Sequence, residues 1–250
     1  MKSRDQKSQS GNDLDQFSAA AQLFESEPID TIERIEAFPK YVSRQCMAKF
    51  FTKYELFQKI LNVNGSIIEC GSLHGAGTLA WAKMSAIFEP ANHTRKIFAF
   101  DTFEGFPSVH AKDKDKGTFN ELEEGGLTGS TEDSISEAIR IFDLNRPISH
   151  IEKVELVKGD IMQTADQFVE ENPQLVVAML YLDFDLYEPT KKALETFLPL
   201  MPRGAILAFD ELNAKIFPGE TRAVDEVVGL RNLEIKRFPF DSYVSYAVLD

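Results

Sequence analysis

Acidic side chains follow two apolar runs in the second half of the chain. Asp183 and Asp185 come directly after VVAMLYL, and Asp210 and Glu211 come directly after AILAF. An apolar run that ends abruptly in acids is typical of a buried parallel strand whose carboxyl end opens into a site. Ligands of open α/β sheets bind outside the carboxyl ends of the strands. We therefore expect these carboxylates to converge on one crevice.

Convergence of several carboxylates favours a divalent cation. Unpaired carboxylates that pack together repel one another and are costly to remove from water. Hard oxygen ligands suit Mg²⁺ or a similar ion, which would offset that cost. The sequence therefore predicts a magnesium-type site at these strand ends.

A glycine-rich turn, IIECGSLHGAGT, lies between an apolar run and a helical pattern. Gly71, Gly75 and Gly77 follow Glu69 there, and glycine lets the backbone approach a nucleotide-like ligand. The spacing G-x-x-x-G-x-G is neither the dinucleotide fingerprint nor a P-loop, which points away from phosphates. A purely structural turn is the alternative.

Two further acids end predicted strands. Asp101 ends KIFAFD, the position from which an acid in such folds reaches ribose hydroxyls, and Asp160 follows VELVKG. The strand ends would then offer a loop for the amino-acid part of a ligand, an acid for its ribose and an acid for its base. Simpler interpretations stay open, because Asp101 suits a turn and Asp185 or Glu188 suits a helix N-terminus.

Predicted strands and helices alternate from residue 66 onward. The expected strands cover 66–71, 96–101 and 154–159, and the two apolar runs supply the fourth and fifth. The expected helices cover 78–88, 133–142, 163–171 and 189–198, with another from about Thr221. The segments 233–240 and 242–249 alternate and meet at Asp241, which predicts a closing antiparallel hairpin.

The alternating part is flanked and interrupted by other segments. Residues 1–13 are polar and are expected to form a mobile tail, and 14–250 a single domain. Within that domain, 14–60 shows helical spacing broken by prolines. The glycine-rich stretch 102–132 is long for a structureless connection, and we expect it to act as a lid.

Composition limits the function classes. The chain has 250 residues, is 43% hydrophobic and carries a formal net charge of -13, which opposes a nucleic-acid partner. It contains no apolar run of about 18 residues, so no membrane span is expected. Cys46 and Cys70 cannot form a disulfide framework, which favours a reducing, cytoplasmic setting. We expect a small-molecule ligand.

Several motifs occur in order between Ile67 and Glu226, namely ECGSLHGAGT, FDTFEGFP, GDI, LDFDLYEPT and FDELNAKIFPGETRAVDE. Together they resemble the macrocin O-methyltransferase (TylF-type) family, metal-dependent sugar O-methyltransferases that use S-adenosylmethionine. The resemblance implies an α/β, Rossmann-like class I methyltransferase fold with a seven-stranded, mainly parallel sheet. The predicted C-terminal antiparallel hairpin agrees with that fold, and the N-terminal helices and the lid are additions to it.

The resemblance also assigns cofactor contacts. It places the methionine portion on the glycine loop, the ribose on the acid of the second strand, and the adenine at the end of the third strand. The residues concerned are Glu69, Gly71, Ser72, Gly75, Asp101, Asp160 and Ile161.

The resemblance further implies a metal and a base. The cation would bind Asp183, Asp210 and Glu211, although the family usually has Asp where this chain has Glu211. A hydroxyl coordinated to a cation has a lowered pKa, and a carboxylate can then take its proton. Asp183 is the preferred base and Asp185 the alternative. Catechol-type relatives place a lysine at the position of Leu186, so a catechol acceptor is disfavoured.

The sequence therefore predicts a Mg²⁺-assisted, S-adenosylmethionine-dependent O-methyltransferase. Its acceptor would be a sugar hydroxyl in a glycoside, nucleotide sugar or secondary metabolite, and we expect the enzyme to be a homo-oligomer. A Rossmann-type NAD(P)-dependent oxidoreductase is one alternative, although the glycine order and the extra carboxylates count against it. A non-catalytic protein that binds a nucleoside-like ligand is the other, although it would not need the carboxylates.

Overall fold

The structure is a computed structural model that describes residues 10–114 and 122–250. The chain divides into two compact units, Met1–Phe51 and Thr52–Asp250. Helix α3 (Arg44–Ile60) crosses the boundary between them. None of the helices in the described ranges is long and apolar enough to cross a membrane.

The first unit is helical. Its elements are α1 (Gly11–Ser26), α2 (Thr31–Glu36), the 3-10 helix η1 (Phe38–Lys40) and the start of α3. Ser10 and Asp13 form a capping box that begins α1, so residues 11–13 belong to a helix and the expected tail boundary at residue 13 is too late. Residues 1–9 of that tail lie outside the described part. Neither α1 nor α2 has a buried residue.

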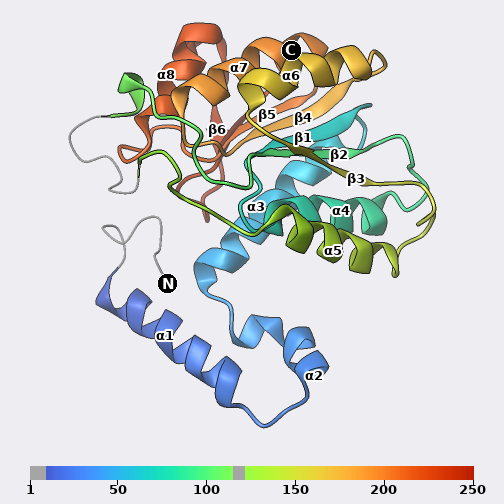
Figure 1. Cartoon of the computed structure of the whole chain (residues 1–250), viewed down its shortest axis with the longest axis vertical. Coiled ribbons are helices and arrows are strands. Elements are labelled where there is room, and N and C mark those ends of the chain that lie inside the picture. Colours follow the sequence, from blue (N-terminus) through green and yellow to red (C-terminus); the bar gives the residue numbers. More distant parts are fainter. Residues whose placement is uncertain (1–9, 115–121) are drawn as a thin grey trace. The chain divides into compact units, whose positions relative to one another are not determined.

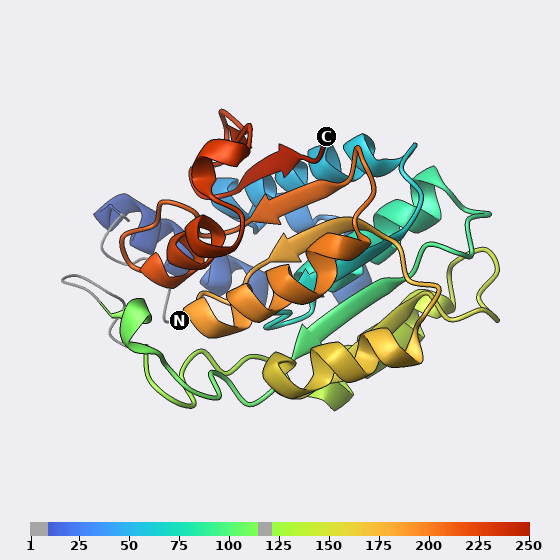
Figure 2. The ribbon, with the colours of Figure 1, turned by 90° about the horizontal axis from the view of Figure 1, so that it is seen from above.

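The second unit is built on the predicted seven-stranded sheet, whose order is β3-β2-β1-β4-β5-β7-β6. The strands are β1 (Ser66–Cys70), β2 (Ile97–Asp101), β3 (Val154–Lys158), β4 (Val177–Leu182), β5 (Ile206–Phe209), β6 (Lys236–Arg237) and β7 (Ser245–Val248). The first five are parallel, and β7 runs antiparallel to β5, as the opposed arrows in Figure 2 show. This arrangement confirms the predicted fold class.

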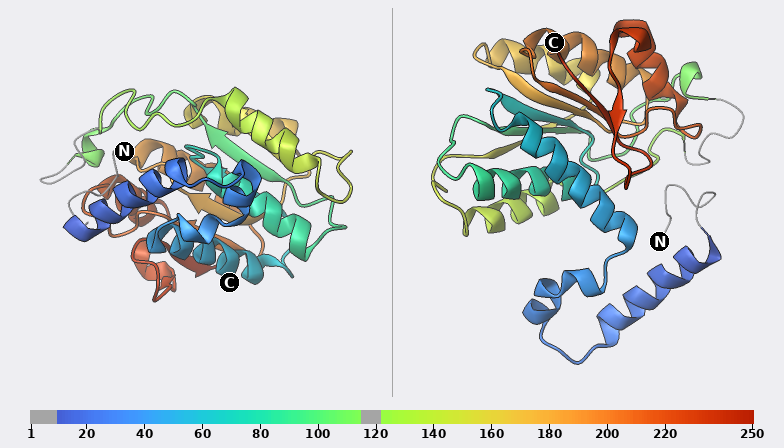
Figure 3. Two further views of the ribbon diagram at one scale, coloured as in Figure 1. Left: turned by 90° about the horizontal axis from the view of Figure 1, so that it is seen from below. Right: turned by 180° about the vertical axis from the view of Figure 1, so that it is seen from behind.

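Helices cover both faces of the sheet. One face carries α4 (Ala76–Phe88) and α5 (Glu132–Asp143), which lie side by side in Figure 3 (left). The other carries α6 (Ile161–Glu171), α7 (Tyr187–Phe197) and α8 (Pro218–Val227), above the sheet in Figure 1. Each face has its own core, with Trp81 and Tyr181 in the first, and Phe100 and Phe197 in the second. The strands are therefore apolar on both sides, as their sequences indicated.

The strand order reverses between β1 and β4, because the chain moves outward to β2 and β3 before it returns. The carboxyl ends of these two central strands are joined directly, since Asp183 N donates to Cys70 O over 2.8 Å. Ligands of such sheets bind at this kind of switch point. The turn after β1 and the acids after β4 thus lie together at the switch point of the sheet.

The C-terminal hairpin differs from the sequence prediction. Its strands β6 and β7 pair antiparallel, but β6 has only two residues, and the link runs from 238 to 244 rather than through Asp241 alone. The Asp241 carboxylate accepts hydrogen bonds from Tyr243 N (3.0 Å) and Val244 N (3.2 Å), and one from the Thr52 hydroxyl (2.7 Å). These contacts form a side-chain-stabilised loop, which ends the pairing early.

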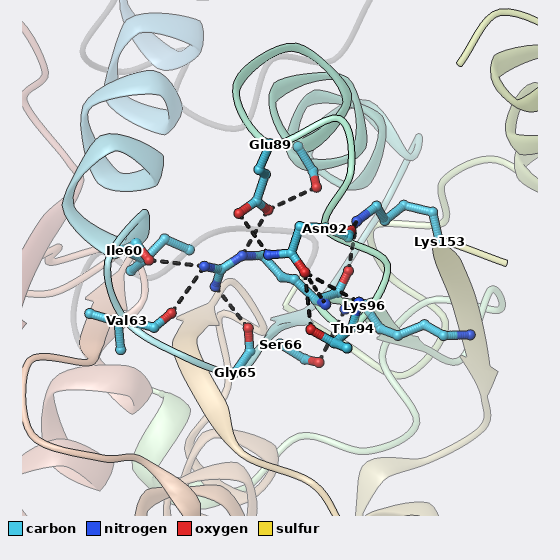
Figure 4. A network of polar contacts seen from close by, with 11 residues as sticks. Ile60, Val63, Gly65, Ser66, Glu89, Asn92, Thr94, Lys96 and Lys153 are labelled. Carbon is cyan, nitrogen blue, oxygen red and sulfur yellow. Dashed lines mark hydrogen bonds and ion pairs between the residues drawn. The ribbon is translucent and has the colours of Figure 1, made fainter. Parts of the chain in front are cut away.

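Arg95 lies just before β2 and joins it to the end of α3. Four of its partners, Ile60, Val63, Gly65 and Glu89, are labelled in Figure 4. Its guanidinium donates to the carbonyls of Gly65 (2.8 Å), Ile60 (3.0 Å) and Val63 (3.0 Å), and to the Glu89 carboxylate (2.8 Å). It is 3% exposed. A buried arginine with a partner for each donor group fixes this end of the sheet.

The insertion 102–132 packs against α7 and α8 over part of its length. Its 3-10 helix η2 (Ala111–Asp113) contacts α8, and the Asp113 carboxylate accepts a 2.6 Å hydrogen bond from Tyr187 N. Farther along, Ser130 N donates to Leu73 O in the glycine loop over 2.8 Å. The insertion therefore contacts both the first turn of α7 and the loop after β1. Residues 115–121, which belong to the expected lid, lie outside the described ranges.

Candidate functional site

Three acidic side chains come together at the carboxyl ends of β4 and β5. Asp183, Asp185 and Glu211 each offer one carboxylate oxygen, and these oxygens lie within 4.8 Å of one another. Asp183 is half-buried, whereas Asp185 and Glu211 are only 2% and 4% exposed. Oxygen donors at this spacing suit a hard divalent cation. Three of the four acids that were expected to converge therefore lie together, and their binding of a cation stays a prediction.

The backbone at Asp185 has an unusual conformation. Its φ of 64° lies in the left-handed region, which aspartate tolerates better than most residues. Helix α7 takes Leu186 as its N-cap and has no side-chain cap, so Asp185 does not cap that helix. The turn instead carries the Asp185 carboxylate into the cluster with Asp183 and Glu211. Non-glycine residues in this conformation cluster at functional sites.

Asp210, which the family resemblance placed among the cation ligands, lies directly after β5, and its role as a ligand stays a prediction. It is 1% exposed, and its Oδ1 accepts a 2.6 Å hydrogen bond from the Tyr181 hydroxyl. Burial, followed by the negative charge of Asp210, raises the pKa of Tyr181 well above its usual value, so the phenol stays a donor. The grouping of three ligand oxygens contains Asp185 where the sequence interpretation had Asp210.

Glu220 is a fourth carboxyl group beside these strand ends, and the sequence analysis assigned it no role. It lies in the first turn of α8, is fully buried, and its Oε1 accepts a 3.0 Å hydrogen bond from Glu211 N. The only sequence signal was its place in FPGET, after a proline that can begin a helix. Acids are common in a first helical turn, so that signal alone indicated nothing more.

The glycine loop after β1 is held by Asp101. One oxygen of its carboxylate accepts from Ser72 N (2.7 Å), Leu73 N (3.0 Å) and the Ser72 hydroxyl (3.1 Å), and the other accepts from Phe103 N (2.7 Å). Asp101 therefore joins the loop after β1 to the loop after β2. Its expected contact with a ribose stays a prediction.

Glycine is required at the first position of this loop. Gly71 has a φ of 91°, and a Cβ there would meet the carbonyl oxygen of Asp183 at 2.1 Å. The loop therefore approaches the backbone of the first site carboxylate directly. The expected contact of Gly71 and Ser72 with the methionine portion of a cofactor stays a prediction.

Glu69 lies beneath the loop and is 1% exposed. Its carboxylate accepts hydrogen bonds from Thr78 Oγ1 and from Trp81 Nε1 (3.0 Å), and Lys53 Nζ lies 3.7 Å away. Burial is the main cause that raises its pKa, and the charge of Lys53 opposes the rise. These contacts place Glu69 as a support for the start of α4. Its expected contact with the cofactor is not tested by them.

Of the remaining expected cofactor residues, Asp160 and Ile161 follow β3, and Gly75 lies in the loop after β1. The Asp160 side chain caps α6 by accepting a 3.0 Å hydrogen bond from Met162 N, and Ile161 is buried in the core of that face. Gly75, at the other loop, has a φ of 72°, and a Cβ there would come within 2.9 Å of the Ile135 side chain. Asp160 and Ile161 therefore already have structural roles, and their contact with adenine stays a prediction.

Comparison with known proteins adds independent information. The macrocin-O-methyltransferase (TylF) family matches residues 41–243. A crystal structure of CalS11, a calicheamicin methyltransferase, is 30% identical, covers 96% of this chain and 93% of its own, and superposes with a TM-score of 0.92. An apo structure of CalS11, described as a TDP-rhamnose 3'-O-methyltransferase of calicheamicin biosynthesis, is also 30% identical, with coverage of 96% and 95% and a TM-score of 0.83.

A more distant structure shows the same fold. The O-methyltransferase NovP is 20% identical, with coverage of 81% of this chain and 79% of its own and a TM-score of 0.65. An O-methyltransferase from Bacillus cereus, solved in complex with SAH, is 13% identical, covers 94% of this chain and 90% of its own, and has a TM-score of 0.51. A search of curated proteins found no match.

Proposed function

We propose a function that proceeds from the family to which the chain belongs, the macrocin-O-methyltransferase (TylF) family. This O-methyltransferase would transfer the methyl group of S-adenosylmethionine to a sugar hydroxyl with the help of a divalent cation. The observation that carries the proposal is the convergence of Asp183, Asp185 and Glu211 beside the glycine loop, at the switch point of the sheet. The 30% identity to CalS11 over nearly the whole chain supports a sugar acceptor.

The donor set fits a cation such as Mg²⁺. Asp183, Glu211 and either Asp185 or Asp210 would hold it, because carboxylate oxygens are the ligands that this ion prefers. When bound, such a cation supplies Lewis acidity that lowers the pKa of an acceptor hydroxyl. Glu211 departs from the aspartate usual in the family, and its place among the grouped oxygens supports its role as a ligand.

Asp183 is the proposed base. It is the most exposed of the three grouped acids, so its carboxylate can reach an acceptor that enters from solvent, whereas Asp185 is almost fully buried. Asp183 would take the hydroxyl proton as the oxygen forms its bond to the methyl carbon and the bond from that carbon to sulfur breaks. Asp185 remains the alternative base.

The cofactor would lie along the ends of β1, β2 and β3. Gly71, Ser72 and Gly75 would hold the methionine portion, with Glu69 supporting the loop, and Asp101 would reach the ribose. Asp160 and Ile161 would flank the adenine. The close approach of Gly71 to the backbone of Asp183 supports this placement, because it brings the cofactor loop to the proposed base.

We further propose a homo-oligomer that works in the cytoplasm. Helices α1 and α2 leave apolar side chains such as Ile32 and Ile35 62% and 57% exposed, and a second copy of the chain would cover them. Cys46 and Cys70 are both free, which suits a reducing compartment. Light scattering on the purified protein tests the oligomer, and the mass of a single chain would contradict it.

Calorimetric titration with S-adenosylhomocysteine and, separately, with NAD⁺ tests the reaction class. We expect binding of the homocysteine nucleoside and none of NAD⁺, and the reverse would favour the oxidoreductase alternative. Transfer of labelled methyl from S-adenosylmethionine to a panel of nucleotide sugars, with Mg²⁺ and with a chelator, then tests acceptor and metal. Equal rates with the chelator would exclude the proposed cation.

A further inference from the structure

Glu220 has an unusual environment for an acid in the first turn of a helix. Its side chain is 0% exposed, so water does not stabilise its charge. Its Oε1 accepts the hydrogen bond from Glu211 N, whereas its Oε2 has no hydrogen-bond partner among the described residues. A buried carboxyl oxygen without a partner is costly, and most such atoms in folded proteins are satisfied.

The surroundings of Glu220 are acidic. Burial raises the pKa of this residue well above its usual value, and the negative charges of Asp210, Asp183 and Asp185 raise it further. The hydrogen bond from Glu211 N places Glu220 directly beside the acids that follow β5. Its backbone is fixed in this position, because a Cβ on the preceding Gly219 would meet Tyr187 N at 2.6 Å. The start of α8 is thus packed against the start of α7.

A purely structural role does not require the charge. The hydrogen bond to Glu211 N needs one acceptor oxygen, which a glutamine amide would supply without a buried negative charge. The second oxygen adds only cost unless a cation or a water bound to it lies within reach. Glu211 is itself among the grouped ligand oxygens, so Glu220 contacts the backbone of a proposed ligand directly.

We propose that Glu220 is a further carboxylate of the divalent-cation site. Its Oε1 positions Glu211 through the backbone N–H, and its Oε2 supplies an oxygen to the cation or to a water that the cation carries. This inference rests on the proposed metal-assisted function and adds a residue, from α8, to the acids of β4 and β5. The cation would then be held by three separate elements of the fold.

Calorimetric titration with Mn²⁺ tests the proposal in wild type, Glu220→Gln and Asp225→Asn. Glu220→Gln keeps an acceptor oxygen of the same reach for Glu211 N and removes only the charge. Asp225→Asn removes the same charge from an exposed position on the same helix, and is the matched control. We expect Glu220→Gln to weaken Mn²⁺ binding by about 10-fold or more, as loss of an outer or inner ligand does, and Asp225→Asn to leave it unchanged.

Thermal unfolding with a chelator separates this role from a structural one. Glu220→Gln should then be at least as stable as wild type, because it loses a buried charge. Equal Mn²⁺ affinity of Glu220→Gln and wild type would overturn the role of Glu220 alone. Absence of Mn²⁺ binding by wild type would overturn the metal-assisted function and this inference together. If Glu220→Gln does not fold, Glu220→Asp decides in its place, since the shorter carboxylate should bind Mn²⁺ more weakly and unchanged affinity would contradict the proposal.

Discussion

The Arg95 network and the carboxylate cluster are both buried ionic groups, but they are built in opposite ways. In the network, opposite charges and carbonyl oxygens meet each donor, as the guanidinium contacts with Glu89, Gly65 and Ile60 show (Figure 4). In the cluster, acids of one sign lie within 4.8 Å of one another, and the buried Oε2 of Glu220 beside them has no hydrogen-bond partner in the described ranges. The network thus brings opposite charges together, whereas the cluster brings like charges together, an arrangement that a bound cation would stabilise.

The two regions also lie at opposite ends of the parallel strands. Arg95 precedes β2 and contacts the residues that enter β1, whereas the cluster follows β4 and β5. Residues at the carboxyl ends of such strands serve ligands, so acidic repulsion is tolerated there. We therefore expect that substitutions in the Arg95 network change stability, whereas substitutions in the carboxylate cluster change catalysis and cation binding.

Asp183→Asn should have the largest effect on chemistry and little on stability. We expect the rate of methyl transfer to fall by about 1,000-fold or more, because both a proposed base and a cation ligand are lost. Stability in urea should stay the same or rise, since one of several like charges is removed. Initial rates with labelled S-adenosylmethionine, together with unchanged affinity for S-adenosylhomocysteine, check this. Retained activity would contradict the assignment of Asp183.

Arg95→Met should show the opposite pattern. The carbonyls of Ile60, Val63 and Gly65 and the Glu89 carboxylate would lose their buried donor, which should reduce the free energy of unfolding by about 3–5 kcal/mol. Turnover should be unchanged at temperatures where the variant is folded. Urea unfolding followed by circular dichroism measures the loss.

The control for Arg95→Met is Arg140→Met. Arg140 pairs with Glu137 over 2.7 Å on an exposed helix surface, so its loss should leave the free energy of unfolding almost unchanged. Equal losses in the two variants would show that the network contributes no more than a surface ion pair.

Lys153 extends the Arg95 network and makes the stability of the fold depend on pH. Its ammonium donates to Asn92 O (2.6 Å) and Arg95 O (2.8 Å), and burial lowers its pKa from 10.5 to about 8. Because its pKa is lowered on folding, its contribution to stability is complete above pH 10.5 and is lost as the pH falls through about 8.

Relative to Lys153→Met, the wild-type free energy of unfolding should therefore rise by at most about 3 kcal/mol as the pH increases from 8 towards 10.5. Urea titrations of both proteins over this range check the difference. A difference that does not vary with pH would show that the lysine keeps its ordinary pKa in the fold.

Tyr181→Phe should have the smallest effect, and this effect should be on cation binding rather than on stability. It removes the 2.6 Å hydrogen bond that orients Asp210 but keeps the ring in the core. We expect Mn²⁺ affinity to fall by about 10-fold, as for other residues that orient acids at a metal site. Tyr54→Phe, on the more exposed part of α3, is the control. An unchanged affinity would show that Asp210 takes no part in holding the cation.

Much of the fold and part of the site followed from sequence patterns. Apolar runs that ended in Asp183 and Asp210 predicted parallel strands and acids at their carboxyl ends, because a strand buried on both faces has no other place for a charge. The glycine turn after β1 was also predicted from a local signal, namely its three glycines between an apolar run and a helical pattern. Both features depend on neighbours in sequence or on the strand period.

Other parts could not be predicted because they depend on contacts between distant segments. The place of Asp185 in the cluster follows from a left-handed backbone turn, and that of Glu220 from the packing of α8 on α7. The carbonyl partners of Arg95 lie 30 to 35 residues away in the chain. Nothing in the local spacing of these residues distinguishes them from ordinary surface charges.

The sequence by itself determined the order of strands and helices, the fold class and the acids that end the central strands. The reason is that burial periodicity and turn residues act over a few positions. Only the tertiary structure decided which carboxylates meet, that Asp210 is held by Tyr181, and that Glu220 is buried beside them. Those outcomes depend on the directions in which side chains leave elements that pack together only when the whole sheet has formed.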